Sequence, residues 1–91
     1  AQSEATAKAT PGAHAYALNN YGLLLKSTGR FSEAVERYRE AVEILAKLED
    51  KRDFYLTALA NLANVYDELG NDEAAKDTYD RLDSLLQRWP G

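Results

Sequence analysis

The chain has 91 residues, a formal net charge of −4 and no cysteine. Hydrophobic residues make up 45 % of it and charged residues 29 %, with few glycines and prolines, which is typical of a folded helical domain and not of a disordered segment. These counts exclude disulfides and thiolate metal sites, and the negative charge argues against nucleic acid as a partner, because phosphate binding requires a concentrated basic surface.

The chain contains no apolar run near the roughly 20 residues that a membrane-spanning helix requires, so we expect no membrane contact. It also contains no methionine, which predicts either an excised domain or the mature product of a processed precursor. We expect a cytoplasmic location and leave a mature periplasmic or secreted form open.

The first dozen residues differ in composition from the rest. Residues 1–12 are rich in alanine and threonine and end in Pro11-Gly12, a pair that interrupts regular structure. We expect them to form either an N-terminal tail or the stub of a preceding helix.

Two segments, residues 18–42 and 59–83, repeat the same pattern of residue sizes 41 positions apart. Agreement over that many positions indicates a structural repeat. We expect a first unit over residues 13–49 and a second over residues 50–91. The pairs include Leu18 with Leu59, Asn20 with Asn61, Gly22 with Ala63, Gly29 with Gly70, Ala34 with Ala75, and Tyr38 with Tyr79.

Small and apolar residues at three- and four-residue spacing predict a first helix in each unit. Gly29 and Gly70 follow these stripes and predict the helix ends, since glycine suits the left-handed residue just past a helix. The stripes consist of Ala17, Leu18, Tyr21, Gly22, Leu24 and Leu25 in the first unit, and of Leu59, Leu62, Ala63, Val65, Tyr66 and Leu69 in the second.

The second helix of each unit is predicted by a similar stripe. Asn71-Asp72 is a plausible N-cap for the last helix, but Asp72 stands near where the first unit has Phe31, so we expect looser packing at that start. The stripes consist of Phe31, Ala34, Val35, Tyr38, Ala41, Val42 and Leu45, and of Ala75, Tyr79, Leu82, Leu85, Leu86 and Trp89.

Small residues in both helices of a unit predict that the two helices approach closely. These residues are Gly22 and Ala34 in the first unit and Ala63 and Ala75 in the second, with Tyr38 and Tyr79 expected to fill the space beside them.

This pattern resembles the tetratricopeptide repeat family, in which a bulky residue, then Leu, then Gly or Ala, then Tyr mark the first helix, and Ala then an aromatic residue mark the second. The resemblance implies an all-α fold of two tandem helix-turn-helix hairpins, a short right-handed α-solenoid segment with four main helices. The usual period is 34 residues, so the seven extra residues, around residues 49–53, predict a longer second helix in the first unit. The longer period looks like the repeats of kinesin light chains and their bacterial relatives.

Residues that support catalysis are sparse. His14 is the sole histidine and has no carboxylates at ligand spacing on its own helix, and the 15 acidic residues fall on polar faces or in turns. We therefore expect no enzyme activity, no metal and no cofactor.

The polar side of the first helices remains as a binding face. In the resembled family this side lines a concave groove that holds an extended peptide or a partner's helix, with asparagines bonding the partner's backbone. The alternative is that these asparagines are merely solvated. The candidate residues are Tyr16, Asn19, Asn20, Leu23 and Lys26 in the first unit, and Thr57, Asn61, Asn64, Asp67 and Glu68 in the second. Because Asp67 and Glu68 outnumber the single basic residue, we expect a neutral or basic partner.

A second function remains open because repeats bury their apolar faces on neighbours and about three are usually needed. We expect an exposed apolar end on the last helix, formed by Leu82, Leu85, Leu86 and Trp89. This end predicts self-association, either as a homo-oligomer or as a domain-swapped dimer that opens at the charged linker.

Overall fold

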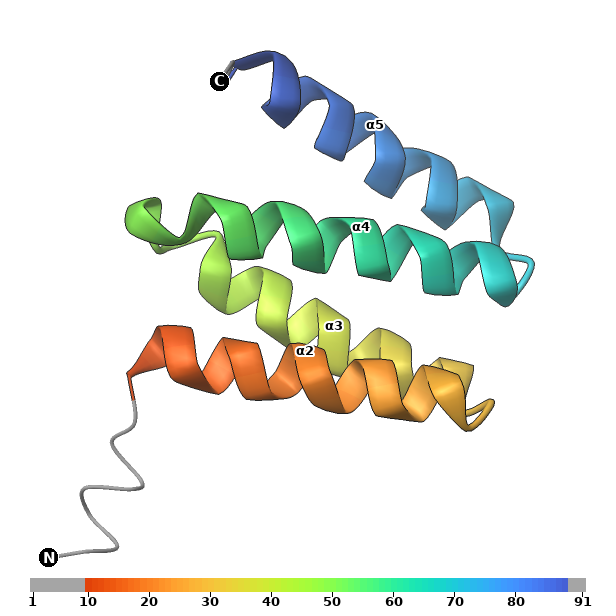
Figure 1. Ribbon diagram of the computed structural model, residues 1–91. Coiled ribbons are helices and arrows are strands. Elements are labelled where there is room, and N and C mark those ends of the chain that lie inside the picture. The colour runs from red at the N-terminus through yellow and green to blue at the C-terminus, as the bar shows by residue number, and fades with distance from the viewer. Residues whose placement is uncertain (1–9, 89–91) are drawn as a thin grey trace, which may run out of the picture.

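The structure is a computed structural model that describes residues 10–88, apart from the side chain of Glu49. Within this range the chain folds into four α-helices and one short 3-10 helix, so the all-α expectation is confirmed (Figure 1). The helices are α2 (Pro11–Ser27), α3 (Phe31–Leu45), η1 (Glu49–Lys51), α4 (Arg52–Glu68) and α5 (Asp72–Arg88).

The helices pack as two sequential hairpins. α3 packs against both α2 and α4, while α5 packs mainly against α4. The first helices of the two hairpins, α2 and α4, consequently lie side by side with α3 behind them (Figure 1). The fold thus places one face of α2 next to one face of α4.

Local sequence signals set most of the helix ends. Gly29 and Gly70 have φ values of 81° and 80°, which confirms the left-handed positions expected after the first helices. The side chain of Asn71 accepts a hydrogen bond from the backbone N–H of Ala74 at 3.3 Å, which confirms the predicted N-cap of α5.

The expectation that Pro11-Gly12 interrupts the chain is wrong, because α2 begins at Pro11. Proline suits the first turn of a helix, where its missing N–H has no partner in any case. Thr10 caps the helix, since its hydroxyl oxygen accepts a hydrogen bond from the N–H of Ala13 at 3.3 Å. Residues 1–9 lie outside the described residues.

The expectation of a longer second helix in the first unit is also wrong. α3 ends at Leu45, and the charged stretch forms η1 and the first turn of α4 instead. Residues 46–51 therefore form a connection between the hairpins, and α4 gains an N-terminal turn that carries Asp53 and Phe54.

The centre of the core is the contact between Tyr38 on α3 and Gly22 on α2. Tyr38 is fully buried, and a Cβ added to Gly22 would lie 2.7 Å from its ring. The Tyr38 hydroxyl has no hydrogen-bond partner among the described residues, and burial raises its pKa above the usual 10.0. Because the folded state holds the Tyr38 proton more tightly than the unfolded chain does, this group leaves the free energy of unfolding unchanged below pH 10. It lowers that free energy as the pH rises through the raised pKa of the folded state.

The second hairpin does not repeat this contact. Tyr79, the counterpart of Tyr38, is 44 % exposed, so the expectation that it fills the space between the helices is wrong. The physical reason is that Ala63 stands where the first hairpin has Gly22, and its methyl group takes up the volume that a ring requires.

α5 is the least buried helix. Ala75 is its one fully buried residue, whereas six residues of α3 are buried. Asp72 is exposed while Phe31 packs partly against the core, which confirms the looser start expected for α5.

We predict that Gly22→Ala lowers the free energy of unfolding by about 1–3 kcal/mol, because the new methyl group overlaps the buried ring of Tyr38. Urea denaturation measures the change. In a Tyr38→Ala background the same substitution is expected to be neutral or stabilising, since alanine favours a helix by about 1 kcal/mol over glycine. An equal loss in both backgrounds would contradict the contact.

Candidate functional site

The side-by-side helices α2 and α4 form one continuous surface, which we call the α2–α4 face. It contains the ten residues that the sequence predicted for a binding face, although their roles differ. Tyr16, Asn20, Leu23, Thr57, Asp67 and Glu68 are exposed, whereas Asn19, Lys26, Asn61 and Asn64 are partly buried.

The partly buried residues bridge the two helices. The Asn61 side chain donates a hydrogen bond from Nδ2 to Oδ1 of Asn19 at 3.0 Å, and Lys26 donates from Nζ to Oδ1 of Asn64. These contacts place the amides at the seam between the hairpins. Each bridging asparagine still has unused hydrogen-bonding capacity, since an amide offers two donors and an acceptor with two lone pairs.

Asn20 does not share this arrangement. It is the repeat counterpart of Asn61, yet the contact across the seam comes from its neighbour Asn19. Asn20 itself is exposed. The sequence therefore identified the right residue type in both helices but could not show which of the two adjacent amides meets the other helix.

An aromatic pair stands at the N-terminal end of this face. The rings of Tyr16 and Phe54 lie 5.8 Å apart between centroids and are tilted by 52°. Lys51 places its Nζ 5.7 Å from the centre of the Phe54 ring. Sequence reasoning missed Phe54 because its segment was expected to belong to the linker. The signal was present in the spacing of Phe54, Thr57, Asn61 and Asn64, which continues the polar side of α4 toward its N-terminus.

Charge is unevenly distributed along the face. Asp67 and Glu68 are exposed at the C-terminal end of α4. Lys26 is occupied by its hydrogen bond to Asn64, and Lys51 lies at the opposite, aromatic end. The face therefore runs from an aromatic end with one cation, across a band of amides, to an acidic end.

Comparison with known protein families decides the class of the chain. The family model described as tetratricopeptide repeat matches residues 13–82. The chain belongs to the tetratricopeptide repeat family. Proteins of this family are generally protein–protein interaction modules and are typically not catalytic. Family membership therefore implies, in general terms, that the partners are proteins. No curated protein and no solved structure gives a significant match to the chain.

The single histidine and the acidic residues of this tetratricopeptide chain are dispersed over the described helices. His14 is exposed in the first turn of α2, and no group of three potential metal ligands occurs among the described residues. No charged side chain is buried among those that the structure describes. None of the described helices is both long enough and apolar enough to cross a membrane.

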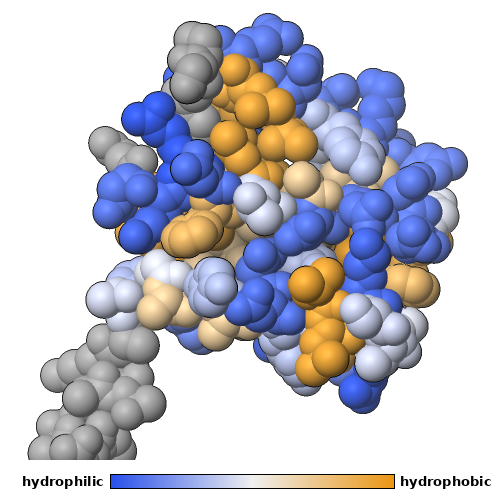
Figure 2. Space-filling model, in the orientation of Figure 1, coloured by the Kyte–Doolittle hydropathy of each residue, from blue (hydrophilic) through white to orange (hydrophobic). Residues whose placement is uncertain are grey.

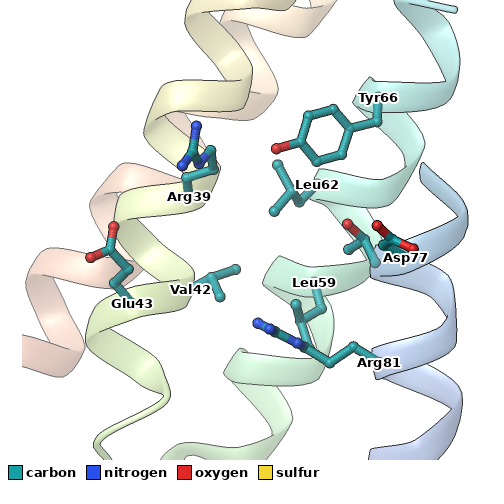
Figure 3. A pocket seen from close by; sticks show the side chains of 9 residues that line it. Arg39, Val42, Glu43, Leu59, Leu62, Tyr66, Asp77 and Arg81 are labelled. Carbon is teal, nitrogen blue, oxygen red and sulfur yellow. The ribbon is translucent and has the colours of Figure 1, made fainter. Parts of the chain in front are cut away.

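A pocket of about 450 Å³ opens on the opposite side of α4, between α3 and α5 (Figure 3). Leu59, Leu62 and Tyr66 of α4 line it from within, and charged side chains stand on its two walls. Arg39 and Glu43 project from α3, and Asp77 and Arg81 from α5. These four side chains carry two positive and two negative charges, so they add no net charge to the pocket.

The residues expected to form an associating end on α5 have different environments. Leu82 and Leu85 are partly buried because they pack against the core. Leu86 is 50 % exposed, and Trp89 lies outside the described residues. The large apolar residues that are exposed on the described part of α5 are Tyr79 and Leu86. Figure 2 shows hydrophobic side chains on the molecular surface over both α5 and α2.

We predict that Tyr16 and Phe54 couple energetically across the seam of the hairpins. In a double-mutant cycle of Tyr16→Ala and Phe54→Ala, the coupling is expected to be about 0.5–1.5 kcal/mol, as for other tilted aromatic pairs. Chemical denaturation of the four chains measures it. A matched cycle of Tyr21→Ala with Phe54→Ala should be additive, since Tyr21 makes no ring contact with Phe54; coupling as large there as in the first cycle would contradict the assignment.

Proposed function

We propose that this tetratricopeptide domain binds an extended peptide or a helix of a partner protein on the α2–α4 face. One observation carries the proposal: Leu23 is 51 % exposed in the middle of the face, between the aromatic pair and the acidic end. About half of this apolar side chain is thus left in contact with water. Contact with an apolar residue of a partner accounts for it.

The neighbouring amides supply the directional part of recognition. Asn61 and Asn64 are held in position by Asn19 and Lys26, so their remaining donors and acceptors are fixed before a partner arrives. A peptide backbone presents alternating donors and acceptors, which match an amide group without regard to the peptide's side chains. Pre-positioned groups also lose less conformational entropy on binding.

Because the two ends of the α2–α4 face differ, they favour one orientation of the bound partner. Tyr16 and Phe54 offer an aromatic surface for an apolar or aromatic side chain. Asp67 and Glu68 favour a basic residue at the other end and disfavour an acidic one. The proposed ligand therefore carries an apolar anchor at one end and positive charge at the other.

We further propose that the chain belongs with the longer-period repeats similar to those of kinesin light chains. The 41-residue offset supports this, as do the 17-residue first helices and the η1 connection.

We predict that Leu23→Glu weakens peptide binding at least tenfold and leaves the melting temperature within about 2 °C, because Leu23 is exposed and lies on the binding face. Peptides selected from a random library on the wild-type chain serve as the probe, and calorimetry gives the affinity. Leu24→Glu is the matched control: it changes the adjacent residue, which is similarly exposed at 58 % but points away from this face. Equal losses for the two variants, or none for Leu23→Glu, would contradict the proposal.

We predict that Asp67→Lys with Glu68→Lys lowers the affinity for a selected basic peptide by about tenfold at low salt, because the attraction at the acidic end becomes repulsion. The loss should shrink as salt is added. Glu33→Lys with Glu36→Lys makes the same change in net charge on α3 and should have a smaller effect. Unchanged affinity of the first pair at low salt would exclude the electrostatic assignment.

A further inference from the structure

The pocket between α3 and α5 is separate from the α2–α4 face, since none of the residues that line it belongs to that face. Its volume of about 450 Å³ lies within the range of roughly 300–1,000 Å³ that is usual for small-molecule sites. Val42, Leu59 and Leu62 form an apolar floor and are themselves buried. The polar groups above this floor therefore decide which molecule fits.

The charged side chains on the two walls of the pocket are arranged with opposite signs. α3 and α5 run in the same direction, because each is the second helix of its hairpin (Figure 1). Along this direction Arg39 precedes Glu43 on α3, whereas Asp77 precedes Arg81 on α5 (Figure 3). The order of charges is thus positive then negative on one wall, and negative then positive on the other.

These four side chains do not neutralise one another. None of them forms an ion pair with a described residue. The ion pairs of α3 and α5 use neighbouring residues instead, such as Arg37 with Glu40 at 3.0 Å and Lys76 with Asp80 at 3.2 Å. A guanidinium group on one wall and a carboxylate on the other are thus available to a bound molecule.

Two hydroxyl groups add a donor near α3 and an acceptor on α5. The Tyr66 ring projects from α4 with its hydroxyl pointing toward Arg39 (Figure 3), so both residues can donate to one carboxylate. On α5, the hydroxyl of Thr78 donates to the backbone oxygen of Ala74 at 2.8 Å. The Thr78 oxygen is left to accept, and together with the neighbouring Asp77 it can receive the protons of one ammonium group.

We propose that this pocket binds a small zwitterion, a dipeptide with apolar side chains and free termini. Its carboxylate accepts from Arg39 and Tyr66. Its ammonium group donates to Asp77 and Thr78, and its side chains lie over the apolar floor. A dipeptide fits better than a single amino acid, because its two charged groups stand at opposite ends of the molecule, as the donors and acceptors of the pocket stand on different walls. Its net charge of zero also matches that of the four charged side chains.

NMR titration of the chain with leucyl-leucine tests the proposal. We expect a dissociation constant on the order of 1 mM, because all four charged side chains are exposed and salt screens their attraction. The backbone amide signals of residues 39–43 and 77–81 should shift and saturate. No saturable shift at these residues, up to about ten times that concentration, would overturn the proposal.

Blocked dipeptides test the two charged contacts. N-acetyl-leucyl-leucine lacks the ammonium group and leucyl-leucinamide lacks the carboxylate, so each should bind at least about tenfold more weakly than leucyl-leucine. Free leucine should also bind more weakly, because both of its charged groups are attached to one carbon atom. Equal affinity for blocked and free dipeptides would indicate a purely apolar contact and overturn the proposal, and so would tighter binding of leucine.

Two variants connect each contact to its residue. Arg39→Gln should lower the affinity for leucyl-leucine by at least about fivefold and bind leucyl-leucinamide nearly as well as the free dipeptide, since the carboxylate has lost its guanidinium partner. Asp77→Asn should instead lose the preference for the free over the acetylated amino group. Variants that keep the wild-type preferences among the three ligands would overturn the assignment.

Matched controls are Arg37→Gln on α3 and Asp80→Asn on α5, which make the same changes of charge on the same helices at residues that do not line the pocket. They should leave the affinity for leucyl-leucine within about twofold of wild type. Leu23→Glu should do the same, which separates this pocket from the proposed peptide-binding face. A loss as large as that of Arg39→Gln in any of these three variants would overturn the proposal.

Discussion

The structure depends on α3 having apolar residues on two sides. One side receives α2, where the ring of Tyr38 lies against Gly22, and the other receives α4. A single hairpin would leave the second side of α3 in water, and this is why the chain repeats its pattern. α5 closes the second hairpin with one fully buried residue, Ala75, and a largely polar outer side. Burial is thus greatest on α3 and least on α5.

The α2–α4 face follows from the same packing. Because α2 and α4 each pack against α3, they lie next to each other, and the sides that they do not bury form one surface. The bridges from Asn61 to Asn19 and from Lys26 to Asn64 join the two helices on that surface. Asparagines that the sequence predicted as partner-binding residues therefore also hold the two hairpins together. The proposed recognition of a partner would use the same amides that join the hairpins, so a variant of Asn61 or Asn64 alone does not separate the two roles.

Local features of the fold could be predicted from the sequence, and those that depend on neighbouring elements could not. The turns at Gly29 and Gly70 and the cap at Asn71 rest on the chemistry of one or two residues. Tyr79 is exposed although its repeat counterpart Tyr38 is buried, and Tyr21 and Leu24 are exposed although their counterparts Leu62 and Val65 are buried. All ten predicted face residues lie on α2 or α4, but Phe54 was missed because the start of α4 was expected to be a linker.

Hydrogen exchange resolved along the chain tests most directly whether the core is centred on α3. The amides of α3 and of the half of α4 that carries Leu62 and Val65 should exchange most slowly and together, through opening of the whole domain. The amides of α5 should exchange faster through local opening, since its burial is slight. If α5 were protected as strongly as α3, or if the two hairpins exchanged as independent units, the interface between α3 and α4 would not hold the fold together.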